Sequence, residues 1–209
     1  MKHHSAQTLE QLRVFPKFLL GVLILAATLL GTGCISATSY VDSALPKINI
    51  ANLKPTAVKR PVRLFFEFQT NGSTNFTVTK NLLPHVVSVL ERSNLFSHVV
   101  TQGSADRKIF ITINNFPITK DAASKGFRVG LTFGLSGTMV TDGYKMDVVY
   151  KRVEGPELRK NYNHALHTTI GNADGPPGVV GMPPGDAVKK VMEELILNLL
   201  NDLIKEGEI

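Results

Sequence analysis

The chain has a single cysteine, Cys34, among its 209 residues, so no disulfide can form within it. Its 23 basic and 17 acidic residues give a net charge of +6, and no block of Lys or Arg concentrates that charge. A mild, dispersed charge lacks the basic patch that is typical of nucleic-acid-binding proteins. The sequence therefore excludes an intramolecular disulfide framework and argues against a nucleic-acid partner.

Motifs of common catalytic and nucleotide sites are also missing. The run Gly134-Leu135-Ser136-Gly137 lacks the Gly-x-Ser-x-Gly spacing of a nucleophile elbow. The glycine-rich segment 171–185 lacks the Gly-Lys-Ser/Thr end of a phosphate loop. His164 and His167 lie three apart on a predicted strand, where they point to opposite faces, so we expect edge or solvated histidines. We predict no enzyme activity, no metal site and no cofactor.

The N-terminus has the polarity of a signal peptide. Residues 18–30 form a 13-residue apolar run, preceded by three basic residues and one acid. As a helix this run would be about 20 Å long at ~1.5 Å per residue, which is short of the ~30 Å hydrocarbon layer. It fits the apolar core of a signal peptide, which is typically about 7–15 residues long. A short uncleaved anchor is the alternative.

The run Leu29-Leu30-Gly31-Thr32-Gly33-Cys34 resembles the cleavage and lipidation box of bacterial lipoproteins. Small residues precede the cysteine as in that box, although Gly31 stands where the family usually has Leu. The resemblance implies cleavage between Gly33 and Cys34, acyl chains on Cys34, and anchoring of the protein in the membrane. Ile35, which is not Asp, resembles an outer-membrane address with a periplasm-facing domain. Lipidation would consume Cys34 and leave no thiol for chemistry.

The remaining chain divides into a tether and one domain. Removal of residues 1–33, with three basic residues and one acid, leaves a net charge of 20 − 16 = +4. Residues 34–60 hold Ser, Thr and Pro without a sustained period, so we expect the lipidated cysteine and an extended tether that lifts the domain off the membrane. Residues 61–209 are expected to form a single domain.

Hydrophobic periodicity predicts an α+β fold in this domain. Alternation indicates strands at 62–69, 95–100, 107–116, 127–139, 144–150 and 158–170, with a hairpin turn at Thr141-Asp142-Gly143. Apolar arcs indicate helices at 78–92 and 187–206, with Thr77 or Thr79 and Asp186 as N-caps. The order β-α-β-β-β-β-β-α predicts a two-layer sandwich: a mixed, mostly antiparallel sheet of five to six strands with two helices on one face.

The segment from Leu83 to Val100 carries a resemblance. Its leucine-rich helix ends at Ser93-Asn94 and is followed by Leu95-Phe96 and a strand. This pattern is similar to one in Gram-negative envelope proteins: the lipopolysaccharide-assembly lipoprotein, the N-terminal domain of the Tol-system propeller protein, the curli secretion lipoprotein and uncharacterised outer-membrane lipoproteins. The resemblance covers most of residues 62–206 and implies packing rather than chemistry.

Two features indicate contact with a partner. The last helix has an apolar arc wider than the stripe that one sheet face requires, so its surplus is either core or docking surface. The preceding segment, Gly171 to Gly185, has five glycines and four prolines and is expected to be a long mobile loop. The predicted partner-surface residues are Val179, Val180, Met182, Leu197, Leu200 and Ile204.

The sequence thus predicts a lipid-anchored, non-enzymatic binding or assembly module at the outer membrane. Its partners are the membrane, through acyl chains on Cys34, and an envelope protein or a lipid. The alternating run Phe127–Tyr150 resembles one hairpin of a transmembrane barrel, so the alternative is a subunit of an oligomeric secretion or pore complex. A hydrolase is the distant alternative.

Overall fold

The computed structural model describes residues 36–55, 57–118 and 137–209, which form a seven-stranded sheet and two long helices. The strands are β1 (Ala37–Val41), β2 (Val62–Thr70), β3 (Ser73–Thr74), β4 (Val99–Val100), β5 (Arg107–Pro117), β6 (Thr138–Arg152) and β7 (Leu158–Ile170). The order across the sheet is β1-β7-β6-β5-β2-β3, and β4 also pairs with β2. β2 runs parallel to β4 and β5, while the other pairs are antiparallel.

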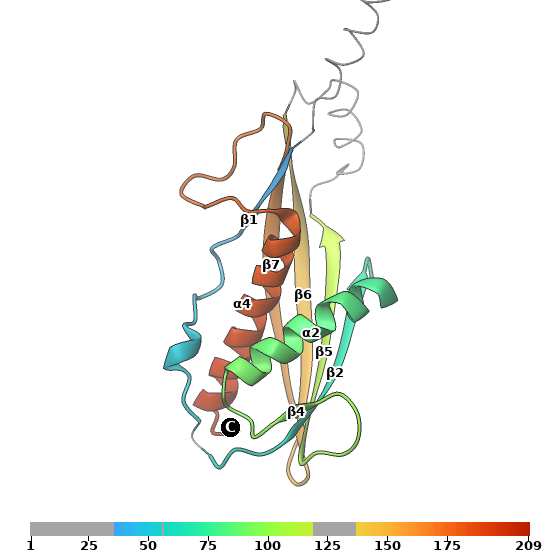
Figure 1. Cartoon of the computed structure of the whole chain (residues 1–209), viewed down its shortest axis with the longest axis vertical. Coiled ribbons are helices and arrows are strands. Elements are labelled where there is room, and N and C mark those ends of the chain that lie inside the picture. The colour runs from blue at the N-terminus through green and yellow to red at the C-terminus, as the bar shows by residue number, and fades with distance from the viewer. Residues whose placement is uncertain (1–35, 56, 119–136) are drawn as a thin grey trace, which may run out of the picture. The chain divides into compact units, whose positions relative to one another are not determined.

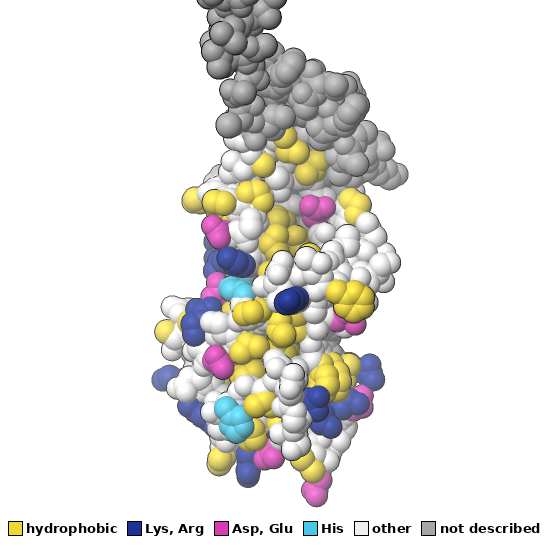
Figure 2. Space-filling view, turned by 45° about the vertical axis from the view of Figure 1, so that its right-hand side comes forward, with side chains coloured by type: hydrophobic (Ala, Val, Ile, Leu, Met, Phe, Trp, Pro, Cys, Tyr) yellow, Lys and Arg dark blue, Asp and Glu magenta, His cyan; other side chains and the backbone are white. Residues whose placement is uncertain are grey.

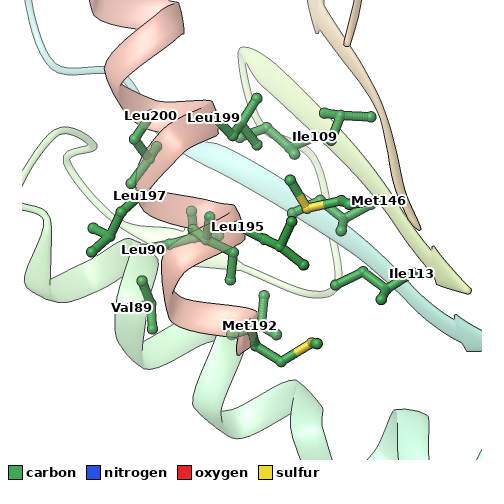
Figure 3. Packing of buried hydrophobic residues seen from close by; sticks show 14 of the residues in the cluster. Val89, Leu90, Ile109, Ile113, Met146, Met192, Leu195, Leu197, Leu199 and Leu200 are labelled. Atoms are coloured by element: carbon green, nitrogen blue, oxygen red, sulfur yellow. The ribbon is translucent and has the colours of Figure 1, made fainter. Parts of the chain in front are cut away.

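The helices α2 (Phe76–Arg92) and α4 (Pro184–Lys205) cover one face of this sheet, as Figure 1 shows. Alternate strand residues, such as Ile109, Ile111 and Ile113 of β5, point into the layer between sheet and helices and are buried there. Figure 3 shows Leu195 and Leu199 of α4 on the side toward Ile109 and Ile113. The predicted α+β sandwich with a mixed, mostly antiparallel sheet is confirmed, with seven strands in place of five to six.

The local signals of α2 explain its boundaries. Asn75 caps the helix by accepting a hydrogen bond from the Val78 N–H at 3.1 Å, so the helix begins two residues earlier than predicted and neither predicted threonine is its cap. Pro84 lies within the helix. At the other end Leu95 and Phe96 are buried, as the predicted packing motif requires, and only Val99–Val100 then pairs with β2.

The helix α4 also begins before its predicted start. Pro184 occupies the first turn, where a missing N–H costs no helical hydrogen bond, and Pro183 stands at the cap position without a side-chain bond. Asp186 is therefore not the cap; it lies in the first turn, where a negative charge is favourable near the helix N-terminus.

The predicted hairpin turn at residues 141–143 is wrong. These residues lie inside β6, which pairs without interruption with β5 on one side and β7 on the other. Gly143 stands opposite Phe116, and a Cβ at Gly143 would lie 2.7 Å from the Phe116 ring. The glycine thus serves close approach of an aromatic ring and not a reversal of the chain. The part of the predicted hairpin before residue 137 lies outside the described residues.

The segment predicted to be a tether contains regular structure. β1 pairs with β7 at the edge of the sheet, and a 3-10 helix, η1 (Ile50–Asn52), follows. Figure 1 shows the chain between β1 and β2 running beside α4. Side chains of this stretch pack against the hydrophobic core: Leu45, Ile48, Ile50 and Leu53. The expectation of a featureless extended tether is therefore wrong.

Candidate functional site

The predicted lipidation site lies just before the described domain. Gly33 and Cys34 fall outside the described residues, and β1 begins at Ala37, three residues after Cys34. All five residues of β1 are in register with β7, from Ala37 opposite Ile170 to Val41 opposite Leu166. The chain thus enters the sheet almost directly after the predicted acyl site.

The helix residues predicted as partner surface are core residues. Leu197 is 4% exposed and Leu200 is 0% exposed, and Ile204 is half-buried against the same core. Figure 3 shows Leu197 on the side of α4 away from the strands. That side faces the segment after β1, since the Asn198 side chain donates a hydrogen bond to the Pro46 carbonyl at 3.0 Å. The wide apolar arc of α4 is therefore explained by contacts on two sides, with the sheet on one side and the segment after β1 on the other.

The loop residues predicted as partner surface behave differently from one another. Val180 is 81% exposed, while Val179 is half-buried. Met182 is half-buried against the core and forms an isolated bridge with Ser39, each backbone N–H donating to the other carbonyl at 2.9 Å. Of the six predicted residues, Val180 alone presents a largely exposed apolar side chain.

The loop before α4 is packed against β1. A Cβ at Gly175 would lie 2.2 Å from the Tyr40 ring, and one at Gly181 would lie 2.5 Å from the Thr38 methyl group. The Gly171 N–H donates to the Ser36 carbonyl at 3.0 Å. The two glycines therefore form a cradle for the Tyr40 ring, and the loop is tied to β1 near both of its ends.

A polar network joins three strands at the same end of the sheet. The His167 ring lies 3.2 Å from the Asp42 carboxylate through Nε2 and 2.9 Å from the Thr141 hydroxyl through Nδ1. Burial alone would raise the pKa of Asp42, but hydrogen bonds from the Ala44 N–H and from His167 outweigh it and hold that pKa below its ordinary value. We interpret these contacts among Asp42, His167 and Thr141 as a lock, a set of side-chain hydrogen bonds that holds the edge strand β1 to β7 and β6.

His164 points to the opposite face from His167, as predicted, but it is buried and not solvated. Its Nδ1 accepts the Ala165 N–H at 3.0 Å, so Nε2 carries the proton and donates to the Glu194 carboxylate at 2.9 Å. Lys190 Nζ lies 3.9 Å from the same carboxylate. This arrangement satisfies a buried histidine and a buried acid of α4 together.

Three arginines gather at the opposite end of the sheet. Arg107 and Arg152 are cross-strand partners on β5 and β6, and like charges in that position repel. With Arg60 they line a cavity of about 360 Å³, together with Asp106 and Glu154. Asp106 lies 3.8 Å from Arg60, and Glu208 lies 3.2 Å from Arg152.

Arg107 is the unusual member of this arginine cavity. It is only 8% exposed, and its Nη1 is buried without a hydrogen-bond partner in the described part of the chain. Burial raises the pKa of the nearby Tyr150 to about 12, and the positive charge of Arg107 acts in the opposite direction. The sequence did carry a signal for this residue, because Arg107 is in phase with the buried Ile109, Ile111 and Ile113 on β5.

The sheet face away from the helices carries an aromatic pair. Phe65 and Phe110 stack with ring centroids 4.3 Å apart. The Arg63 guanidinium lies 4.4 Å from the Phe65 centroid and Lys151 Nζ lies 5.6 Å from the Phe110 centroid, both within cation–π range. This cluster of rings and cations is built from β2, β5 and β6.

Charge is segregated along the strands. Among the described residues, the segments at the end of the sheet where β1 begins contain no Lys or Arg and four aspartates: residues 36–46, 112–118, 137–144 and 163–188. In the face shown in Figure 2, dark blue side chains lie in the middle and lower parts of the domain. Among the described residues, Lys and Arg therefore lie away from the end of the sheet where β1 begins, and at the arginine cavity they are accompanied by the acidic residues Asp106, Glu154 and Glu208.

Within the described ranges no three or more His, Cys, Asp or Glu side chains are placed to bind a metal ion together. Among helices in the same ranges, none combines the length and apolar character needed to cross a bilayer.

Comparisons with known proteins give no family for the chain. No family model matches it, and no curated protein does. Among solved structures, a Xanthomonas campestris protein described under DUF330 matches at 12% identity and a TM-score of 0.33, covering 78% of this chain and 86% of its own. The PelC dodecamer from Paraburkholderia phytofirmans, crystallised as a point variant, matches at 12% identity and a TM-score of 0.30, covering 81% of this chain and 98% of its own. Likenesses of this size assign neither a family nor an activity.

Proposed function

We propose that this protein is a lipid-anchored, non-enzymatic accessory module of the bacterial envelope, at the periplasmic face of the outer membrane. In this proposal Cys34 carries the acyl chains, and the domain binds an anionic group of an envelope partner at its arginine cavity. The observation that carries it is the position of β1. The strand that follows Cys34 begins at the end of the sheet opposite the arginine cavity.

Chain length supports a short connection to the membrane. Ala37 is three residues after Cys34, and at ~3.3–3.6 Å per residue this stretch reaches about 11 Å at most. β1 is fixed to β7 by its register and by the lock of Asp42 and His167. A lipid on Cys34 would hold the domain next to the bilayer and direct the arginine cavity away from it.

The arginine cavity supports an anionic ligand group. A planar guanidinium binds carboxylates and phosphates through paired N–H donors, and such bonds are stronger than neutral ones. Arg107 has a buried Nη1 donor without a partner among the described residues, and Arg60 and Arg152 have side chains 57% and 39% exposed. A carboxylate or phosphate bound here would relieve the repulsion between Arg107 and Arg152.

The anchor is tested by following acylation. Cells that express the wild-type chain or Cys34→Ser are labelled with an alkyne fatty acid and fractionated. We expect label and carbonate-resistant membrane association in the wild type and neither in the variant. An unlabelled wild-type protein would refute the anchor.

The binding end is tested by site-specific photocrosslinking in intact cells. A benzophenone amino acid replaces Val153, which is 79% exposed beside the cavity, or Phe76, which is 80% exposed at the start of α2. We expect a crosslinked product from position 153 that is lost with Arg152→Glu and retained with Lys80→Glu, an exposed lysine of α2. A product that is insensitive to Arg152→Glu would refute the anionic contact.

A further inference from the structure

Val180 is the most exposed large hydrophobic residue of the described chain. The other exposed large hydrophobic residues in the described part of the chain are Val58, Phe76, Ile118, Met139 and Val153. A singly exposed apolar side chain is ordinary on a protein surface and requires no explanation by itself. Val180 differs because of where the fold places it.

The loop holds Val180 at the end of the sheet where β1 begins. The Met182–Ser39 bridge lies two residues after Val180, and Gly181 packs against Thr38 and Tyr40. Figure 1 shows this loop, which joins β7 to α4, beside the start of β1. Val180 is therefore presented by backbone that is fixed on the strand nearest Cys34.

The covalent distance to the acyl site is short. The loop is bonded to Ser36 through the Gly171 N–H, and Ser36 is two residues after Cys34. Two residues span at most about 7 Å. A bilayer that holds acyl chains on Cys34 would lie within reach of this loop.

The composition of the loop suits an interfacial environment. Residues 171–183 have no Lys or Arg and one acid, Asp174, and four of them are glycine and three are proline. An apolar side chain gains free energy when it leaves water for the acyl boundary, and the loop brings no other ionic side chain that must be desolvated with it.

We infer that Val180, supported by Val179, forms a second contact of the domain with the bilayer that anchors Cys34. The inference rests on the proposed lipidation. The occupant of this surface is the lipid layer itself, at the boundary between headgroups and acyl chains. Two attachment points, the acyl chains and Val180, then fix the tilt of the domain and keep the arginine cavity away from the membrane.

Site-specific labelling of the full lipidated protein tests this contact. Because the acylated Cys34 has no free thiol, a nitroxide attaches only at an introduced cysteine. Val180→Cys is compared with Val153→Cys and Val58→Cys, whose parent valines are 79% and 76% exposed. Each protein is reconstituted in phosphatidylethanolamine–phosphatidylglycerol vesicles, and collisions with oxygen and with a water-soluble nickel complex are measured.

We expect the label at position 180 to collide at least several-fold more with oxygen than with nickel, relative to the same ratio at positions 153 and 58. A label at 180 that is as accessible to nickel as the two controls, on a protein that carries the fatty acid, would overturn the membrane contact and leave the anchor intact. Labelling of Cys34 itself, in protein without the fatty acid, would overturn the anchor on which the inference rests.

Discussion

The burial of Leu200 in α4 leads to a prediction that separates core from docking surface. Leu200 is completely buried, although the sequence allowed it to be part of a binding face. Leu200→Ala removes three carbon atoms, worth about 2.4 kcal/mol at ~0.8 kcal/mol each. The cavity left behind adds to this, so we expect the free energy of unfolding to fall by about 2–5 kcal/mol.

The measurement is urea unfolding of the acyl-free chain, prepared with Cys34→Ser and without the signal segment. The matched control is Val180→Ala, an exposed aliphatic truncation, for which we expect a change within about 0.5 kcal/mol. The midpoint for Leu200→Ala should fall while the slope of the transition stays the same. A Leu200→Ala protein that unfolds at the wild-type midpoint would show that α4 is not covered on its outer side, and the reasoning would be refuted.

Three further predictions concern the sheet end near β1. Gly143→Val should lower the free energy of unfolding by about 1–3 kcal/mol, because a Cβ at this position would meet the Phe116 ring at 2.7 Å. Thermal unfolding measures the change, and Lys145→Ala on the same strand is the control. Gly72→Ala is unsuitable as a control because Gly72 has a positive φ. The lowered pKa of Asp42 gives stability that is present above the unfolded-state pKa and is lost as pH falls through the folded-state pKa. Asp42→Asn should therefore lower stability at neutral pH and flatten its decline in acid, and an unchanged acid limb in urea titrations at several pH values would contradict this. Burial raises the pKa of Asp142, so its charged form costs stability at neutral pH; Asp142→Asn should stabilise the protein at pH 7 relative to low pH, and equal effects at both pH values would count against it.

Long periodic elements were predictable from the sequence because their signal is local. β7 was predicted at 158–170, the bounds that the structure shows, and β5 was predicted to within one residue. In both strands the residues facing the helices alternate with residues facing the open side over more than ten positions. Such a pattern constrains register strongly, because a shift of one residue would exchange the two faces.

The missed elements depend on contacts between distant parts of the chain. β1 has five residues of mixed polarity, and its partner β7 lies about 130 residues later. The Asp142-Gly143 pair gives a strong local turn signal, yet strands on both sides and the Phe116 ring require a continuous β6. In each case the deciding interaction is tertiary, so a local pattern cannot contain it.

The predicted partner surface was likewise only partly predictable from the sequence. Val179, Val180 and Met182 were predicted as partner surface because they lie in a loop rich in glycine and proline, and of the three only Val180 is largely exposed. Leu197 and Leu200 were predicted as a possible partner surface because the apolar arc of the last helix is wider than one sheet face requires, with core as the alternative, and both are buried. The packing of Leu45, Ile48, Ile50 and Leu53 on the core is a tertiary contact that the local pattern of the predicted tether did not contain.

The structure of residues 37–53 also bears on how freely the domain could move relative to the proposed anchor. A tether would make the orientation of the domain independent of the lipid, and any of its surfaces could then meet the membrane or a partner. If Cys34 carries the proposed lipid, an edge strand that begins three residues later leaves the domain no comparable freedom. In the proposed anchoring, the end of the sheet where β1 begins would lie near the bilayer, and the arginine cavity lies at the opposite end of strands 11–15 residues long, about 35–50 Å at ~3.3 Å per residue. At that separation, several times the ~8 Å Debye length at physiological salt, the arginines of a protein anchored in this way would not interact electrostatically with lipid headgroups and would be available to the proposed anionic partner.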